Sequence, residues 1–85
     1  MIYSIEFSRS AEKQFADVPR SELKKIAKRI DKLALDPFPP GHEKLKGLDD
    51  LYRIRQGDYR ILYSIFEAKL IVLIVKIGHR REIYR

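Results

Sequence analysis

The sequence predicts an α+β fold in which an antiparallel helical hairpin covers one face of a mainly antiparallel sheet. Two observations lead to this prediction. Apolar residues between positions 11 and 34 recur with the period of a helix, and from position 51 onward the period becomes that of strands. A strand-like segment precedes the helices, so the predicted order is β-α-α-β-β-β. With 85 residues the chain has room for a single domain, which we assign to residues 1–85.

The N-terminal segment predicts a strand followed by a short helix. Ile2–Phe7 is rich in β-branched and aromatic residues, as strands are. Residues 11–18 then carry apolar side chains at i, i+4 and i+7, and Ser8 or Ser10 offers an N-cap. Pro19 marks the start of another helix, because proline is tolerated in a first helical turn.

The second helix is the clearest element in the chain. Residues 23–34 place apolar side chains at i, i+3, i+4, i+7, i+10 and i+11, with lysines and an arginine on the other side. Asp36–Gly41 contains three prolines and a glycine, which end this helix. We interpret the following residues, His42–Asp50, as a polar connector.

Three strands complete the prediction. Leu51–Gln56 and Tyr59–Phe66 flank Gly57-Asp58, and Leu70–Ile77 follows a second turn. The last strand lacks polar alternation, so we expect it to be central and covered on both faces. Because the chain is short, the sheet face opposite the helices should otherwise stay open.

The turn at Gly57-Asp58 fixes a register for the hairpin. A two-residue loop with glycine first pairs Gln56 with Tyr59 and Arg55 with Arg60. Paired residues share a face and faces alternate. One face then carries Tyr52, Ile54, Ile61 and Tyr63, and the other carries Arg53, Arg55, Arg60 and Leu62.

This register places like charges opposite one another, which destabilises a sheet. One interpretation is that nearby acids neutralise the arginines. The other is an anion site whose ligand supplies the missing charge, since a guanidinium matches phosphate oxygens bidentately. The candidate acids are Asp49, Asp50, Asp58 and Glu82.

Composition agrees with an anionic partner. The chain carries 18 Lys+Arg against 12 Asp+Glu, a net charge of +6. Residues 44–85 carry ten basic and five acidic side chains, so +5 of this excess lies in the second half. Such a surface attracts polyanions, although solubility alone is the alternative explanation.

Composition also excludes several classes of site. There is no cysteine and there are only two histidines, which argues against disulfides, iron–sulfur clusters and zinc sites. We therefore expect no metal and no cofactor. No signal peptide or membrane span is visible, so we expect a cytoplasmic protein without a membrane partner.

The C-terminal stretch extends the basic surface. After Gly78-His79 come Arg80 and Arg81, and then Tyr84. A tyrosine beside arginines is typical of a platform for base stacking above a phosphate clamp. The alternatives are a solvated basic tail and a tyrosine ring packed on the sheet edge.

These segments resemble the RelE branch of the RelE/ParE toxins of toxin–antitoxin modules. The resemblance covers nearly the whole chain. It is carried by residues 7–13, residues 35–41 (Leu-Asp-Pro-Phe-Pro-Pro-Gly), residues 44–48, the hairpin of residues 51–63 and residues 76–84.

The resemblance implies a toxin that cleaves messenger RNA in the ribosomal A site without a metal. The ribose 2′-OH attacks the adjacent phosphate, leaving a 2′,3′-cyclic phosphate and a 5′-OH end. It also implies a RelB-like antitoxin that wraps around the toxin in a hetero-oligomer. The catalytic residues matched to the family are Arg53, Arg55, Arg60, Arg80 and Tyr84, and RNA contacts are assigned to Lys44, Lys46, His79 and Arg81.

One departure from the family concerns the general base. RelE-like toxins often carry lysines where this chain has Arg53 and Arg55, and arginine essentially cannot lose its proton. Other candidates for the base are Tyr84, His79, Glu82 and Lys46.

Two other functions remain compatible with the sequence. One is a ParE-like toxin that inhibits DNA gyrase without cutting RNA, since one fold can carry both activities. The other is an inactive basic binding module held by its antitoxin. Tyr84 together with the basic pair Arg53 and Arg55 favours the ribonuclease.

Overall fold

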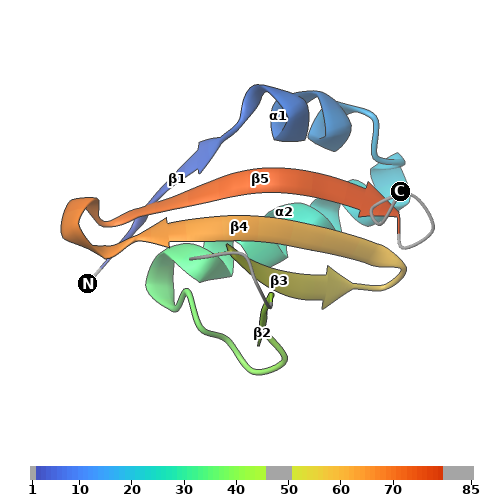
Figure 1. Ribbon diagram of the computed structural model, residues 1–85. Coiled ribbons are helices and arrows are strands. Elements are labelled where there is room, and N and C mark those ends of the chain that lie inside the picture. The colour runs from blue at the N-terminus through green and yellow to red at the C-terminus, as the bar shows by residue number, and fades with distance from the viewer. Residues whose placement is uncertain (1, 46–50, 80–85) are drawn as a thin grey trace.

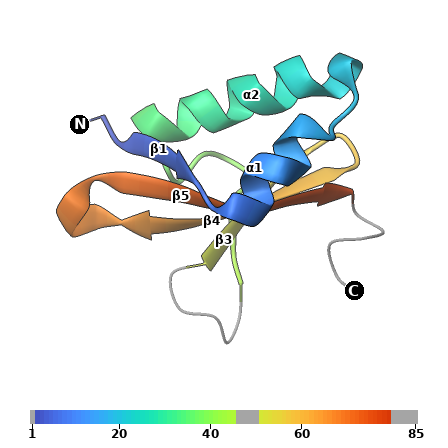
Figure 2. The ribbon, with the colours of Figure 1, turned by 90° about the horizontal axis from the view of Figure 1, so that it is seen from above.

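In the part of the chain that the structure describes, five strands form one sheet with both helices on the same face (Figures 1 and 2). The structure is a computed structural model, and it describes residues 2–45 and 51–79. The strands are ordered β1-β5-β4-β3-β2 across the sheet. β1 pairs with β5 in parallel, and the other pairs are antiparallel. The predicted fold class is therefore confirmed. The strands are β1 (Ser4–Phe7), β2 (Glu43–Lys44), β3 (Leu51–Gln56), β4 (Tyr59–Phe66) and β5 (Ile71–His79).

The two helices are α1 (Arg9–Ala16) and α2 (Arg20–Leu35), and a short 3-10 turn, η1 (Glu67–Lys69), joins β4 to β5. Ser8 is the N-cap of α1, and its hydroxyl accepts a hydrogen bond from the Ala11 N–H at 3.0 Å. Pro19 occupies the N-cap position of α2. Helix α2 lies over the same sheet face as α1 (Figure 2).

Strand β2 was not predicted, because the connector His42–Asp50 was interpreted as irregular. Glu43 pairs with Arg53 and Lys44 with Tyr52, which adds β2 to the edge of β3. Two residues are too few to show a period of two in the sequence. Only the pairing with β3 identifies them as a strand.

Strand β5 lies between β1 and β4, as expected of a central strand, but the reason given for it was wrong. The helices cover only one of its faces (Figure 2). The alternation is interrupted instead by a β-bulge, since Leu62 pairs with Lys76 whereas Tyr63 pairs with Ile74. Val75 is the extra residue, and it shifts the phase of the strand so that Val72, Ile74 and Ile77 all face the core.

The core lies between the helices and the covered face of the sheet. The predicted helical stripe contributes Ile26, Ile30 and Leu33, which are all essentially buried. The sheet contributes residues from all three long strands: Ile54, Ile61, Tyr63, Val72, Ile74 and Ile77. Neither helix covers the opposite face of the sheet (Figure 2).

Candidate nucleic-acid interface

The hairpin register places three arginines on the open face of the sheet. β3 and β4 pair Arg55 with Arg60, Ile54 with Ile61 and Arg53 with Leu62. This is the register expected from the two-residue loop. Ile54 and Ile61 are fully buried against the helices, so Arg53, Arg55 and Arg60 point to the other side. We call this set, with Leu62, the arginine face.

Glu43 of β2 partly neutralises the arginine face. Its carboxylate lies 2.6 Å from Arg53 Nη2 and 3.7 Å from Arg55 Nη2. Glu43 was not among the four acids considered from the sequence, because strand β2 was not predicted. Three of those four acids, Asp49, Asp50 and Glu82, lie outside the described residues. One exposed carboxylate shared by two guanidiniums is a weak electrostatic partner.

Arg60 is the most deeply placed cation of the arginine face. It is 9% exposed and is the one buried charged residue in residues 2–45 and 51–79. Its Nη1 donates to the Tyr59 carbonyl at 3.5 Å. Burying a guanidinium costs free energy, and groups held in such environments cluster at functional sites.

Lys76 belongs to the same face and was missed by the sequence analysis. It pairs with Leu62, which in turn pairs with Arg53, so the three residues form one row across β5, β4 and β3. The sequence pattern alone does not reveal this position, because regular alternation from Ile74 would turn Lys76 toward the helices. The β-bulge at Val75 reverses that orientation.

His79 lies on the other side of the sheet from the arginine face. It pairs with Tyr59, and the two rings are 5.6 Å apart between centroids. Its Nε2 is 4.0 Å from Asp58 Oδ2. With Gln14 and Asp17 of the α1 segment, His79 lines a hollow of about 390 Å³. Its predicted contact with RNA stays a prediction.

The remaining predicted site residues, both catalytic and RNA-binding, are distributed as follows. Lys44 pairs with Tyr52, so its exposed side chain is on the opposite side of β2 from Glu43. Lys46, Arg80, Arg81 and Tyr84 lie outside the described residues.

A second basic surface lies on α2. Lys25, Lys28, Arg29 and Lys32 line a small hollow of about 150 Å³ together with Gln56. Arg29 Nη2 donates to the Arg55 carbonyl at 3.2 Å, which ties the helix to β3. The helix periodicity predicts Lys25, Lys28 and Arg29 on the side of α2 away from the core; Lys32 was not part of that prediction.

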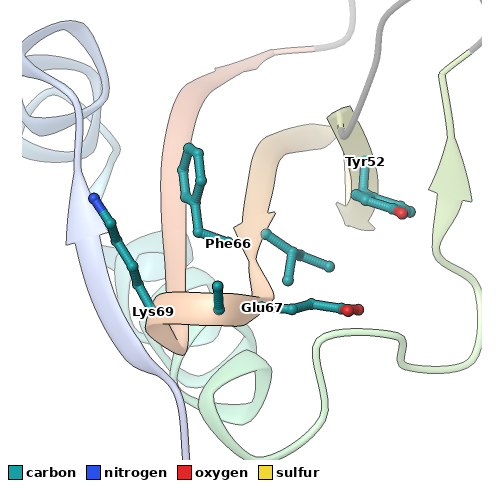
Figure 3. A pocket seen from close by; sticks show the side chains of 6 residues that line it. Tyr52, Phe66, Glu67 and Lys69 are labelled. Carbon is teal, nitrogen blue, oxygen red and sulfur yellow. The ribbon is translucent and has the colours of Figure 1, made fainter.

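Another hollow, of about 430 Å³, lies at the other end of the sheet, beside η1. Figure 3 shows Tyr52, Phe66, Glu67 and Lys69 around it. It brings together one acid, one base and aromatic rings, so it lacks the concentrated positive charge of the arginine face.

The described residues suggest neither a metal centre nor a membrane span. Within residues 2–45 and 51–79, His, Asp and Glu form no group of three that could hold a metal ion. In the same ranges no helix is long and apolar enough to cross a membrane.

Comparisons of the sequence with known proteins all find toxins. Residues 5–84 match the family described as ParE toxin of type II toxin-antitoxin system, parDE. A putative toxin RelE1 of Methanocaldococcus jannaschii is 33% identical over 100% of this chain and 98% of its own. Toxin RelG of Mycobacterium tuberculosis is 28% identical over 100% of this chain and 99% of its own.

Solved structures show the same fold. The archaeal RelE–RelB complex from Pyrococcus horikoshii contains a chain that is 29% identical, with a TM-score of 0.83 over 96% of this chain and 99% of that one. In the intact Escherichia coli RelBE toxin–antitoxin complex, a chain that is 23% identical gives a TM-score of 0.81 over 91% of this chain and 95% of that one.

Proposed function

This chain belongs to the ParE toxin family of type II toxin–antitoxin systems and is a RelE-like toxin, and on that basis we propose that it is a ribosome-dependent mRNA endonuclease. It would cleave message in the ribosomal A site and so inhibit translation in the cytoplasm. The observation that carries the proposal is the arginine face, where Arg53, Arg55 and Arg60 share an open sheet surface.

The proposed reaction uses the chemistry of the RNA itself. The 2′-oxygen attacks the adjacent phosphorus as it loses its proton, and the P–O5′ bond breaks. The products are a 2′,3′-cyclic phosphate and a 5′-OH end. Negative charge grows on the phosphoryl oxygens in the transition state, and preorganised guanidiniums are suited to stabilise it. The ribosome would supply the in-line geometry of the extended strand.

Each arginine has a proposed part in this reaction. Arg60, held in place by burial, would bind the phosphate undergoing cleavage. Arg53 and Arg55 would exchange their contacts with Glu43 for contacts with RNA phosphates. Arg80 and Tyr84 remain proposed for phosphate binding and base stacking because their positions match the family motif.

The experiment is primer extension on ribosome-bound message with wild type and Arg60→Ala. We expect Arg60→Ala to lose cleavage by about 100-fold or more, since removing one preorganised charge contact typically costs that much. Lys25→Ala on α2 removes an equal charge outside the arginine face and should cleave as wild type does. Unchanged cleavage in a folded Arg60→Ala protein would contradict the proposal.

We also propose a RelB-like antitoxin as the partner. Structures similar to this chain are RelE–RelB complexes. The described surface offers two open sheet edges, at β1 and β2, and exposed apolar side chains such as Leu35 and Phe38, which suit a wrapping chain. The antitoxin segment that crosses the arginine face should be acidic. Purification from cells that co-express the neighbouring operon gene should yield a complex, and recovery of the toxin alone would count against it.

Gyrase inhibition is the second candidate, because the matching family is named for ParE. The two functions give opposite results with purified toxin. Blocked supercoiling with intact ribosomal mRNA would establish the gyrase function. Cleaved mRNA with normal supercoiling would establish the endonuclease.

A further inference from the structure

The β-bulge in β5 determines which way Lys76 points. Val72 and Ile74 face the helices and are fully buried, so regular alternation would send the side chain at position 76 to the same side. Val75 is inserted instead, and Lys76 pairs with Leu62 on the open face. Bulges of this kind re-aim a side chain and are over-represented beside active sites.

Two side chains from the α1 region hold the backbone on either side of Lys76. Ser8 Oγ donates to the Val75 carbonyl at 2.8 Å. Gln14 Oε1 accepts from the Ile77 N–H at 2.7 Å. Strand β1 ends at Phe7, opposite Ile74, so these side chains take over the pairing that β1 no longer provides. The orientation of Lys76 is therefore fixed by contacts distant in sequence.

Lys76 faces a surface whose charges are mostly positive. Among the described residues, the charged groups on this face are Arg60 of β4, Arg53 and Arg55 of β3, Glu43 of β2 and Glu6 of β1, with Lys76 itself on β5. Gly78 pairs with Arg60 and adds no side chain at that position. Lys76 contributes the one primary amine on the strands of this face.

We propose that Lys76 is a catalytic residue that accepts the proton of the ribose 2′-OH. This rests on the proposed endonuclease function and supplies the base that Arg53 and Arg55 cannot provide. In this step the amine nitrogen takes the proton as the 2′-oxygen bonds to phosphorus. The P–O5′ bond breaks with its electron pair on the 5′-oxygen, which takes a proton from water. Ser8 and Gln14 are positioning residues for this amine.

The test compares Lys76→Met and Lys76→Arg with wild type under single-turnover conditions on programmed ribosomes. A general base contributes about 10²- to 10⁴-fold, so both variants should lose cleavage by that order, with KM little changed in Lys76→Arg. The pH profile of cleavage should also differ between wild type and Lys76→Arg, because a guanidinium cannot act as the proton acceptor. Lys69→Met on η1 removes the same charge at the other end of the sheet and should cleave as wild type does.

The outcomes separate this inference from the function on which it rests. If wild type leaves ribosomal mRNA intact, the endonuclease proposal fails and this inference fails with it. If wild type cleaves and Lys76→Met cleaves equally, only the inference fails. If Lys76→Arg keeps the wild-type rate and pH profile, the amine is a phosphate-binding cation and its role as proton acceptor is overturned.

The positioning role of Gln14 has its own test. Gln14→Ala removes the acceptor for the Ile77 N–H, and Gln14→Glu keeps an acceptor oxygen at the same place. We expect the cleavage rate to fall in Gln14→Ala and to recover in Gln14→Glu, with the pH profile recovering too. If Gln14→Ala melts normally and cleaves with the wild-type pH profile, Gln14 does not position Lys76.

Discussion

At the scale of single residues, Arg60 and Tyr63 lie three positions apart on β4 and are both shielded from solvent, with different consequences. Tyr63 is fully buried, stacks on Tyr52 with ring centroids 5.8 Å apart, and donates its hydroxyl hydrogen to the Pro37 carbonyl at 2.8 Å. Its polar group is satisfied within the core. Arg60 brings a charge to the open side of the same strand. We therefore expect Tyr63 to contribute to stability, whereas Arg60 is a residue of the proposed site.

Tyr63→Phe tests the structural role of this hydroxyl. The substitution leaves the Pro37 carbonyl without its partner, and such a loss costs about 1–3 kcal/mol of unfolding free energy. Tyr52→Phe is the matched control, on the same sheet face and half-buried, and should change stability by about 0.5 kcal/mol or less. Urea unfolding of both variants at neutral pH measures the difference, and equal stabilities would refute the role.

Tyr63→Phe also tests how folding stability depends on pH in the alkaline range. Burial raises the pKa of the Tyr63 phenol above its ordinary value of 10, Tyr52 and Asp36 add to the rise, and Arg29 opposes it. As pH rises, the Tyr63 phenol therefore ionises at a lower pH in the unfolded state than in the folded state. The free energy that this phenol contributes to stability is complete below about pH 10 and is lost as pH rises further. The stability gap between wild type and Tyr63→Phe should narrow above about pH 10.

At the scale of elements, the β3–β4 turn sets the composition of the arginine face. Gly57 has φ +60° and is the first central residue of the two-residue loop, which is the geometry of a type II′ turn. A loop one residue longer would shift the register and send arginines toward the core. The glycine therefore affects the site without contacting it.

Gly57→Ala tests this turn. A Cβ there would lie 3.6 Å from Glu22 Oε2, which is an ordinary contact, so the cost comes from the backbone conformation. We expect a loss of about 1–2 kcal/mol of stability, measured by thermal or urea unfolding. Gln56→Ala, at the adjacent strand position, is the control and should lose less. A Gly57→Ala protein as stable as wild type would exclude the turn geometry described here.

At the scale of the whole molecule, positive charge gathers on two separate surfaces. One is the arginine face, and the other is the solvent side of α2, on the helical layer (Figure 2). Net charge alone cannot tell them apart, because either surface would attract a polyanion. Only one of them combines arginines with an open sheet.

Salt dependence distinguishes the two surfaces. Each phosphate contact to single-stranded RNA adds about 0.7 to the slope of log affinity against log salt. Replacing Arg53 and Arg55 by Gln should lower that slope by about 1.4. The control replaces Lys25 and Lys28 of α2 by Gln, an equal change in charge, and should leave the slope unchanged. If the control lowers the slope as much, RNA binds α2 instead.

Local patterns were enough to predict the parts of the fold that depend on nearby residues. The helical spacing of apolar residues in positions 23–34 correctly predicted that Ile26, Ile30 and Leu33 are buried. The glycine at position 57 correctly predicted the register of β3 and β4, and this register in turn predicted the arginine face. The resemblance to RelE/ParE toxins is confirmed by the family match over residues 5–84.

Parts that depend on distant residues could not be predicted in this way. Strand β2 exists because its edge meets β3, and Glu43 becomes the partner of Arg53 only through that pairing. The bulge in β5 is held by Ser8 and Gln14, which are more than sixty positions away. No local period reports such contacts, so Lys76 was overlooked and the faces of β5 were misjudged.

The sequence by itself thus determined the class of the fold, the register of the hairpin and the gathering of three arginines, because turn geometry and side-chain period are local properties of the chain. The tertiary structure alone decided that Glu43 contacts Arg53 and Arg55, that His79 lies on the opposite face, and that Lys76 lies on the arginine face. Each of these depends on strand pairing or helix contacts across the fold, where backbone groups must find partners whatever their distance along the chain.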